Sequence, residues 1–273
     1  MLDGLQSILS GSEQVRIVVS SVEATLPAIG QREDSSKKQD RGTSSSREEL
    51  LVELEKNSRL SLNFFILVFL STIVAAVGLI KDNVAVVIGA MVIAPLLGPN
   101  LSLALSTALG ERPLMWKSIW TNLSGLGLTL LLSILIGLLW PLNFDSRELI
   151  ARTDVGLDSV ALALASGAAA VLSLTTGLSS VLVGVMVAVA LMPPAVTLGL
   201  MFSSGQFQLA GSAALLLVNN VVCLNLAANL VFLTKGIGPR TWREKKQARY
   251  SMLSSIIFWV LALTVLLTLI QWR

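Results

Sequence analysis

Seven apolar segments, each long enough to cross a lipid bilayer, occupy most of the chain after residue 60. A transmembrane helix needs roughly 20 mainly apolar residues to cross ~30 Å of hydrocarbon. Only 14% of the 273 residues are charged, whereas soluble domains have about 25%. The segments cover approximately residues 61–80, 83–109, 116–141, 158–175, 178–203, 209–234 and 251–270. We therefore expect an all-α, polytopic integral membrane protein with about seven transmembrane helices. Its expected partners include the lipid bilayer in which these helices lie.

The remaining residues show several changes of composition. Residues 1–30 form a short N-terminal segment, expected to be cytoplasmic, in which residues 13–29 suit one strand and a turn. Residues 31–47 are rich in Ser, Lys, Asp and Gln, which is typical of a disordered linker. Residues 48–60 have leucines at helical spacing. This pattern predicts an amphipathic helix at the membrane interface.

Positive charge predicts which side of the membrane each loop occupies. The loop over residues 235–250 contains six basic residues and one acidic residue. Short loops rich in Lys and Arg stay in the cytoplasm. Seven crossings and a cytoplasmic N-terminus place this loop inside, together with Arg112 and Lys117. We expect a multi-pass protein of the cell's inner (plasma) membrane. The basic run has no interleaved aromatic residues, so we expect no nucleic-acid partner.

The apolar part of the sequence repeats itself. Residues 86–111 (VVIGAMVIAPLLGPNLSLALSTALGE) resemble residues 181–206 (VLVGVMVAVALMPPAVTLGLMFSSGQ). The alignment pairs Gly89 with Gly184, Met91 with Met186 and Pro99 with Pro194. It also pairs the first segment with the fourth and the third with the sixth. This gives two three-helix units, residues 61–141 and 158–234, followed by an extra helix, and three crossings per unit would invert the second unit.

Prolines interrupt the second and fifth segments at matched positions. Proline has no N–H and clashes with the carbonyl four residues earlier. We therefore expect helix breaks at Pro95, Pro99, Pro193 and Pro194. Broken backbone in a membrane persists where it is buried in protein or lines a wet cavity. Two matched breaks predict a solute site at the membrane midplane. Proline kinks that serve packing alone are the alternative interpretation.

Uncharged polar residues near these prolines are the candidate site residues. The predicted solute-binding residues are Gly98, Pro99, Asn100, Ser102, Asn122, Pro193, Pro194, Thr197, Asn225 and Asn229. Asn225 and Asn229 are four residues apart and share a helix face, whereas Asn219 and Asn220 point elsewhere. Hydrogen bonding between helices explains such asparagines as well as solute binding does.

The residue inventory argues against catalysis. The chain has no histidine and one cysteine, Cys223, which suits packing better than reactivity. We find no nucleophile with a base and no pair of carboxylates, so we expect no enzyme activity, no cofactor and no metal. The leading hypothesis is a transporter or channel-like facilitator for a small polar or anionic solute.

The alternative is a structural or regulatory membrane subunit that binds a partner protein. Small residues recur at every fourth position in the second segment. They are Ala90, Ala94, Gly98, Ser102, Ser106 and Gly110. Such a stripe lets another helix approach closely, and it also favours a homo-oligomer.

One stretch resembles a known family. Residues 78–106 (GLIKDNVAVVIGAMVIAPLLGPNLSLALS) are similar to the signature of domain-of-unknown-function family 389, the bacterial and archaeal uncharacterised hydrophobic domain. The matching residues are Gly78, Leu79, Asn83, Ala85, Gly89, Ala90, Met91, Ala94, Pro95, Gly98 and Pro99. Val84 and Asn100 depart from the pattern, which has Ser and a hydrophobic residue there. The resemblance covers residues 50–234 and implies a polytopic membrane protein without a settled activity.

Overall fold

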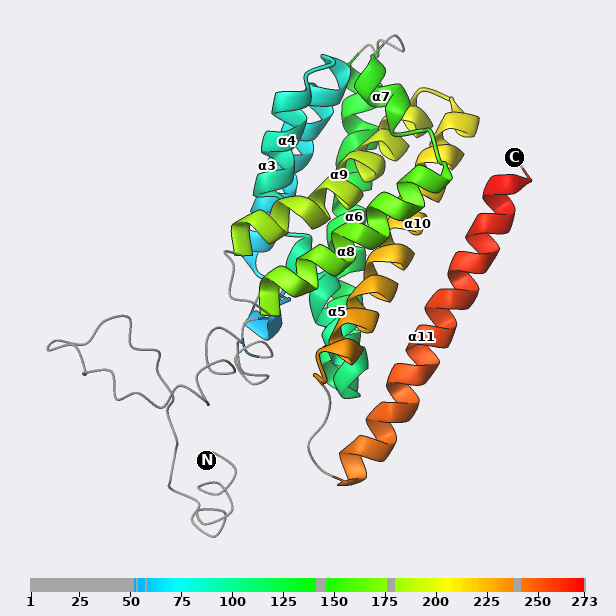
Figure 1. The fold of residues 1–273 in the computed structure, drawn as a ribbon. Coiled ribbons are helices and arrows are strands. Elements are labelled where there is room, and N and C mark those ends of the chain that lie inside the picture. The colour runs from blue at the N-terminus through cyan, green and yellow to red at the C-terminus, as the bar shows by residue number, and fades with distance from the viewer. Residues whose placement is uncertain are drawn as a thin grey trace, which may run out of the picture. The chain divides into compact units, whose positions relative to one another are not determined.

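The computed structural model describes residues 52, 54–56, 58–140, 146–175, 180–237 and 242–272 (Figure 1). Within these ranges the regular structure is helical and contains no strand. The strand expected in residues 13–29 and the disordered linker at 31–47 lie outside the described residues. The helices are α3 (Leu62–Ile80), α4 (Val84–Ile93), α5 (Leu97–Leu109), α6 (Arg112–Leu139), α7 (Arg147–Ala151), α8 (Leu157–Thr175), α9 (Ser180–Ser203), α10 (Phe207–Thr234) and α11 (Trp242–Gln271).

Local sequence signals set several helix ends. α3 begins after Ser61, whose hydroxyl accepts a hydrogen bond from the Phe64 N–H, as N-cap serines do. α5 ends at Gly110, whose positive φ of 76° suits glycine. Pro113 lies in the first turn of α6, where its missing N–H breaks no helical hydrogen bond. The α6 helix therefore begins four residues before the apolar segment predicted at 116–141.

The apolar segments coincide with the long helices. Within the part of the chain that the structure describes, five helices are long and apolar enough to cross a membrane: α3, α6, α8, α10 and the Leu253–Gln271 part of α11. α4 and α5 together form a sixth candidate span, bent by 54°. The structure thus has the character of a multi-pass membrane protein. In α9, the apolar helix Ala190–Ser203 is shorter than these candidate spans. The presence of seven transmembrane helices therefore stays a prediction.

The two proline-bearing segments differ. In the second, α4 ends at Ile93 and α5 begins at Leu97, with Pro95 between them. In the fifth, α9 continues from Ser180 to Ser203 with Pro193 and Pro194 inside the helix. The prediction of a helix break at Pro193 and Pro194 is therefore wrong. Pro194 leaves the Ala190 carbonyl without its helical N–H partner. Asn220 of α10 donates a hydrogen bond to this carbonyl, so α9 can continue without a break.

The helices pack around α6, α9 and α10. α6 contacts α3, α5 and α9, and α10 contacts α5, α8, α9 and α11. In Figure 1, α3 and α6 run upward through the bundle, whereas α8 and α10 run downward. α5 descends to the lower end and α9 rises to the upper end. Most buried apolar side chains of these helices belong to one cluster that includes residues of α3, α4, α5, α8, α9 and α10.

Candidate solute-binding site

The inner face of α6 is polar along most of its length. After Leu114, each buried residue of this helix is Ser, Thr, Asn or Gly. They are Ser118, Thr121, Asn122, Gly125, Thr129 and Ser133. Large apolar residues of α6, including Leu123 and Leu131, are exposed on its surface instead. Helices in membranes pack through small residues, but a buried face this rich in hydroxyl and amide groups also places hydrogen-bonding groups through the depth of a bilayer.

Asn100 of α5 and Asn122 of α6 meet beside the break between α4 and α5. Asn100 Nδ2 lies 2.8 Å from Asn122 Oδ1 and 2.9 Å from the carbonyl oxygen of Leu96. Both asparagines are buried, with 3% and 9% of their surface exposed. Asn122 Nδ2 has no hydrogen-bond partner among the described residues. A buried amide donor without a partner is costly, so this atom is a point at which a bound ligand would gain a hydrogen bond.

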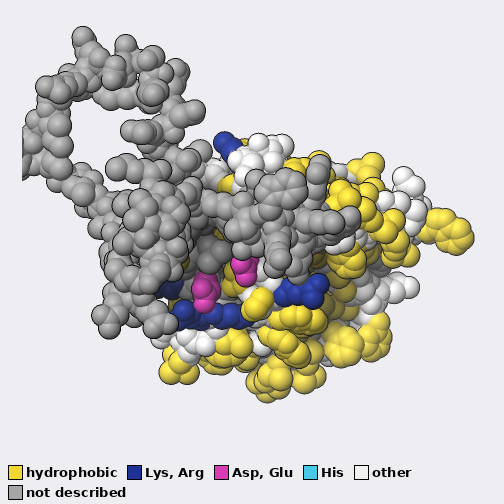
Figure 2. Space-filling view, turned by 90° about the horizontal axis from the view of Figure 1, so that it is seen from below, with side chains coloured by type: hydrophobic (Ala, Val, Ile, Leu, Met, Phe, Trp, Pro, Cys, Tyr) yellow, Lys and Arg dark blue, Asp and Glu magenta, His cyan; other side chains and the backbone are white. Residues whose placement is uncertain are grey.

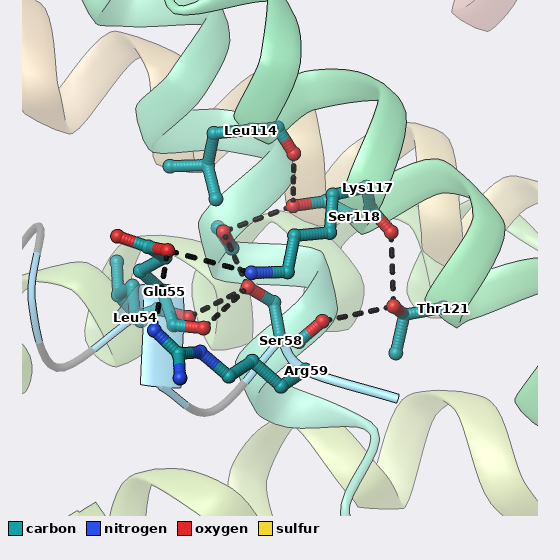
Figure 3. A network of polar contacts seen from close by, with 9 residues as sticks. Leu54, Glu55, Ser58, Arg59, Leu114, Lys117, Ser118 and Thr121 are labelled. Atoms are coloured by element: carbon teal, nitrogen blue, oxygen red, sulfur yellow. Dashed lines mark hydrogen bonds and ion pairs between the residues drawn. The ribbon is translucent and has the colours of Figure 1, made fainter. Parts of the chain in front are cut away.

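A network of hydroxyl groups joins α5 and α6 to the residues before α3 (Figure 3). Ser118 Oγ of α6 lies 2.9 Å from Ser102 Oγ of α5, which lies 3.2 Å from Ser58 Oγ. Thr121 Oγ1 of α6 donates to the Ser58 carbonyl at 2.9 Å. Ser118 and Asn122 are four residues apart and therefore share a face of α6. The network thus lies one helical turn from the asparagine pair.

Charged residues border this network. Glu55 forms an ion pair of 3.4 Å with Lys117 of α6 and one of 3.5 Å with Arg59. All three side chains are at least a third exposed, so these pairs contribute little stability. Figure 2 shows Lys and Arg side chains, with fewer acidic ones, on this end of the protein beside a large apolar surface. The hydroxyl network therefore ends at a mainly basic surface.

Toward the other end of α6, Thr129 Oγ1 accepts a hydrogen bond of 3.4 Å from Thr72 Oγ1 of α3, and glycines bring α6 close to α9. A Cβ atom on Gly199 of α9 would lie 2.5 Å from Ser133 Cβ and 3.0 Å from the Leu130 carbonyl oxygen. A Cβ atom on Gly137 of α6 would overlap Ser203 of α9. Only glycine permits such an approach. The helices α6 and α9 are thus in backbone-to-backbone contact at this end.

A second polar group joins α5 to α10. Thr107 Oγ1 of α5 donates to Asn229 Oδ1 at 3.0 Å. Asn229 Nδ2 donates to the Asn225 carbonyl, and Asn225 Nδ2 donates to the Val221 carbonyl, both at 2.9 Å. Asn225 Oδ1 is buried and has no partner among the described residues. The predicted residues Asn225 and Asn229 therefore belong to a group distinct from the Asn100–Asn122 pair.

Other polar residues of α9 and α10 lie outside both of these groups. Asn220 Nδ2 of α10 donates to the Ala190 carbonyl at 2.6 Å, and that carbonyl lies four residues before Pro194. Thr197 is fully buried, and its hydroxyl has no partner in the described part of the chain. Cys223 is buried against Val160 and Ala163 of α8. It packs there as a small side chain, and its Sγ donates to Asn219 Oδ1 at 3.6 Å.

The sequence pattern identified part of this site. Asn100, Ser102 and Asn122 lie together beside the helix break, while Gly98 and Pro99 are buried in the first turns of α5. Sequence reasoning missed the hydroxyl residues of α6 and Ser58. A usable signal was present, because the small or polar residues 118, 122, 125, 129 and 133 follow the spacing of one helix face.

These features define an all-helical, multi-pass type of membrane protein with one broken span beside a polar helix face. A family model described as "Domain of unknown function (DUF389)" matches residues 91–226. The chain is also 35% identical over 270 residues to uncharacterized protein MJ0678 of Methanocaldococcus jannaschii. The alignment covers 99% of this chain and 83% of that protein. The chain belongs to the DUF389 family, which confirms the resemblance seen in residues 78–106. No solved structure matches the chain.

Proposed function

We propose that this protein moves a small polar or anionic solute across the membrane, as a carrier or a channel-like facilitator. The observation that carries the proposal is the polar inner face of α6 where it meets the broken span at Asn100 and Asn122. Polar groups within a membrane are costly and commonly mark solute pathways. A broken helix adds backbone N–H and carbonyl groups that no regular helix would leave free.

The proposed path follows the inner face of α6. It begins at the basic surface near Lys117, passes Ser118 and Ser102, and reaches Asn122 beside the break. Beyond that point the close contact of Gly199 with α6 closes the path. Movement of α9 relative to α6 would then be the step that opens the second half.

An inverted repeat fits this mechanism and forms part of the proposal. The helices α3 and α6 run opposite to α8 and α10 in Figure 1, which supports a second half inserted upside down. The third helix of each half also packs on the second span of the other, α6 on α9 and α10 on α5. Inverted halves give inward-facing and outward-facing states by exchanging their conformations.

The alternative of a partner-binding subunit has less support. Its main argument was the small-residue stripe of the second apolar segment. Ala90, Ala94, Ser102 and Ser106 are buried within the protein. That stripe therefore serves contacts inside this chain, and another face would have to bind a partner or a second copy.

A flux assay with the purified full chain in liposomes tests the proposal. The solutes are inorganic anions, inorganic cations, amino acids and neutral osmolytes. We expect flux of at least one class, and a large loss of that flux in Asn122→Leu, which removes the amide at similar volume. Leu123→Ala, on the exposed face of the same helix, is the matched control and should retain flux. Folded protein that transports none of these solutes would overturn the proposal.

A second variant addresses the helix break. Pro95→Ala restores an N–H opposite the Met91 carbonyl and favours a continuous helix from α4 into α5. We expect this variant to insert normally and to transport more slowly than the wild type. Unchanged flux would show that the break is dispensable for transport.

A further inference from the structure

We infer that the group bound beside the α4–α5 break is a small monovalent anion, held by Asn122 Nδ2 and by backbone N–H groups in the first turn of α5. The inference rests on the proposed transport function and narrows its solute class. Two independent observations carry it: the start of α5 and the orientation of the Asn122 amide.

The first observation is the uncapped start of α5. This helix has 13 residues, and its N-cap residue, Leu96, forms no side-chain capping hydrogen bond. The first N–H groups of a helix have no partner within the helix. Pro99 has no N–H, so Leu97 and Gly98 supply the backbone donors of the first turn. The N-terminal end of a helix also has partial positive charge and favours anions.

The second observation is a chain of hydrogen bonds that fixes the Asn122 amide. The Leu96 carbonyl can only accept, so the Asn100 atom 2.9 Å away must be Nδ2. That nitrogen can only donate, so the Asn122 atom 2.8 Å away must be Oδ1. The remaining Asn122 atom is therefore Nδ2. It is a buried donor without a partner, on a side chain that is 9% exposed.

The two features are neighbours in the fold. Asn100 donates both to the carbonyl of Leu96, the N-cap residue of α5, and to Asn122, so the Asn122 side chain lies beside the first turn of α5. The unpaired side-chain group here, Asn122 Nδ2, is a donor, and the start of α5 is the positive end of a helix, so a ligand that accepts hydrogen bonds and has negative charge suits both. Solutes that only donate, such as ammonium, would leave the Asn122 amide unpaired.

The surrounding charges favour a monovalent ion. No described residue of α4 or α5 is charged, and the charged residues of α6 lie in its first two turns. Arg112 and Lys117 are both basic and lie on the side of Asn122 from which the proposed path begins. Without a buried cation to offset its charge, a divalent anion such as sulfate would lose too much hydration. Chloride, bromide, nitrate and formate fit these requirements.

Flux measurements on the reconstituted full chain test the inference. Sodium salts of chloride, nitrate, formate and sulfate are compared with urea and glycerol, using electrical current for ions and light scattering for neutral solutes. We expect current from the monovalent anions and little from sulfate. Transport of neutral polar solutes without anion current would overturn the inference and leave the proposed function standing, whereas transport of cations alone would overturn both. Absence of all flux would overturn both.

The Asn122→Asp variant tests the amide itself. It keeps an oxygen facing Asn100 and replaces the unpaired donor by an acceptor at the same volume. We expect nitrate flux at about pH 8 to fall roughly tenfold or more, since a hydrogen bond to a charged group is lost. The control is Asn83→Asp, because Asn83 is an exposed N-cap of α4 where Asp caps equally well.

Nitrate flux in Asn122→Asp equal to that of Asn83→Asp would overturn the inference. A binding measurement on the wild type keeps the test open if Asn122→Asp does not fold. We expect sodium nitrate to raise the unfolding temperature of the purified protein in detergent more than sodium gluconate at equal ionic strength, because a ligand of the native state stabilises it. Equal effects of the two salts would also overturn the inference.

Discussion

Asn220 shows how a single side chain can accommodate a proline inside a continuous apolar helix. Pro194 leaves the Ala190 carbonyl without its helical N–H partner. Asn220 Nδ2 of α10 donates to that carbonyl at 2.6 Å. An unpaired carbonyl within a membrane costs free energy, and the asparagine removes that cost. This contact explains why α9 is continuous where the sequence alone predicts a break.

The contact predicts a specific coupling between two substitutions. Asn220→Leu, which has similar volume but no donor, should lower the free energy of unfolding by about 1–3 kcal/mol. Pro194→Ala restores the missing N–H, so Asn220→Leu should cost about 1 kcal/mol less in that background. Unfolding of the purified protein in mixed micelles measures both values. Pro193→Ala is the control, because it restores an N–H for a different carbonyl and should leave the cost of Asn220→Leu unchanged.

The sequence identifies Pro194 as a disruption of the helix but does not identify Asn220 as the residue that compensates for it. The positions of Pro193 and Pro194 identify which backbone carbonyls lack a helical N–H partner. The identity of the group that satisfies them depends on which face of α10 meets α9. Asn220 lies 30 positions along the chain from Ala190, and apolar helices with small residues can pack in several rotations. The same limit applies to Asn100 and Asn122, whose pairing required the relative rotation of α5 and α6.

The packing of α8 on α10 depends on a glycine. A Cβ atom on Gly167 of α8 would lie 2.9 Å from both Cα and the carbonyl oxygen of Leu224. Backbone atoms cannot move aside as a flexible side chain can, so Gly167→Ala should lower the free energy of unfolding by about 1–3 kcal/mol. Gly211→Ala on α10 is the matched control, since no atom lies within 4 Å of the added methyl group. Equal unfolding free energies for the two variants would contradict this account of the α8–α10 contact.

The residues that precede α3 are anchored to α5 and α6. Leu54 is 1% exposed and belongs to the main apolar cluster, whereas Val52 is 64% exposed. Leu54→Ala should therefore lower the free energy of unfolding by about 2–5 kcal/mol, and Val52→Ala should have little effect. Chemical unfolding of the full chain followed by intrinsic tryptophan fluorescence measures both. The prediction that residues 48–60 lie at the membrane interface remains untested.

Hydropathy predicts where a helix lies in the sequence better than it predicts which of the helix's residues have a function. The apolar segment at 116–141 coincides with most of α6, because long apolar runs have few alternatives to a membrane helix. The functional content of α6 lies in its buried residues, including Ser118 and Thr129. Hydropathy averages over both faces of a helix and hides such a stripe. The second proline of a pair, or one serine among leucines, likewise changes the average little.

The proposed inverted repeat predicts that the two halves of the molecule run in opposite directions. The turn after α5 lies at the lower end of the bundle in Figure 1, and the turn after α9 lies at the upper end. An odd number of crossings separates the two turns in this arrangement. The proposal places the first turn in the cytoplasm, because Arg112 and Lys117 outnumber Glu111 at this end of α6 and basic residues favour the cytoplasmic side. A repeat inserted in a single orientation would instead place both turns on one side.

Cysteine labelling distinguishes these arrangements. Glu111 follows α5 and Gln206 follows α9, and both are exposed. The native Cys223 is fully buried and adds little background. We expect a membrane-impermeant maleimide to label Glu111→Cys only from the cytoplasmic side and Gln206→Cys only from the outside, in oriented vesicles with permeabilised vesicles as the reference. Lys235→Cys, after α10, should react from the same side as Glu111→Cys. Labelling of Glu111→Cys and Gln206→Cys from one common side would rule out the inverted repeat, because α5 and α9 would then cross the membrane in the same direction.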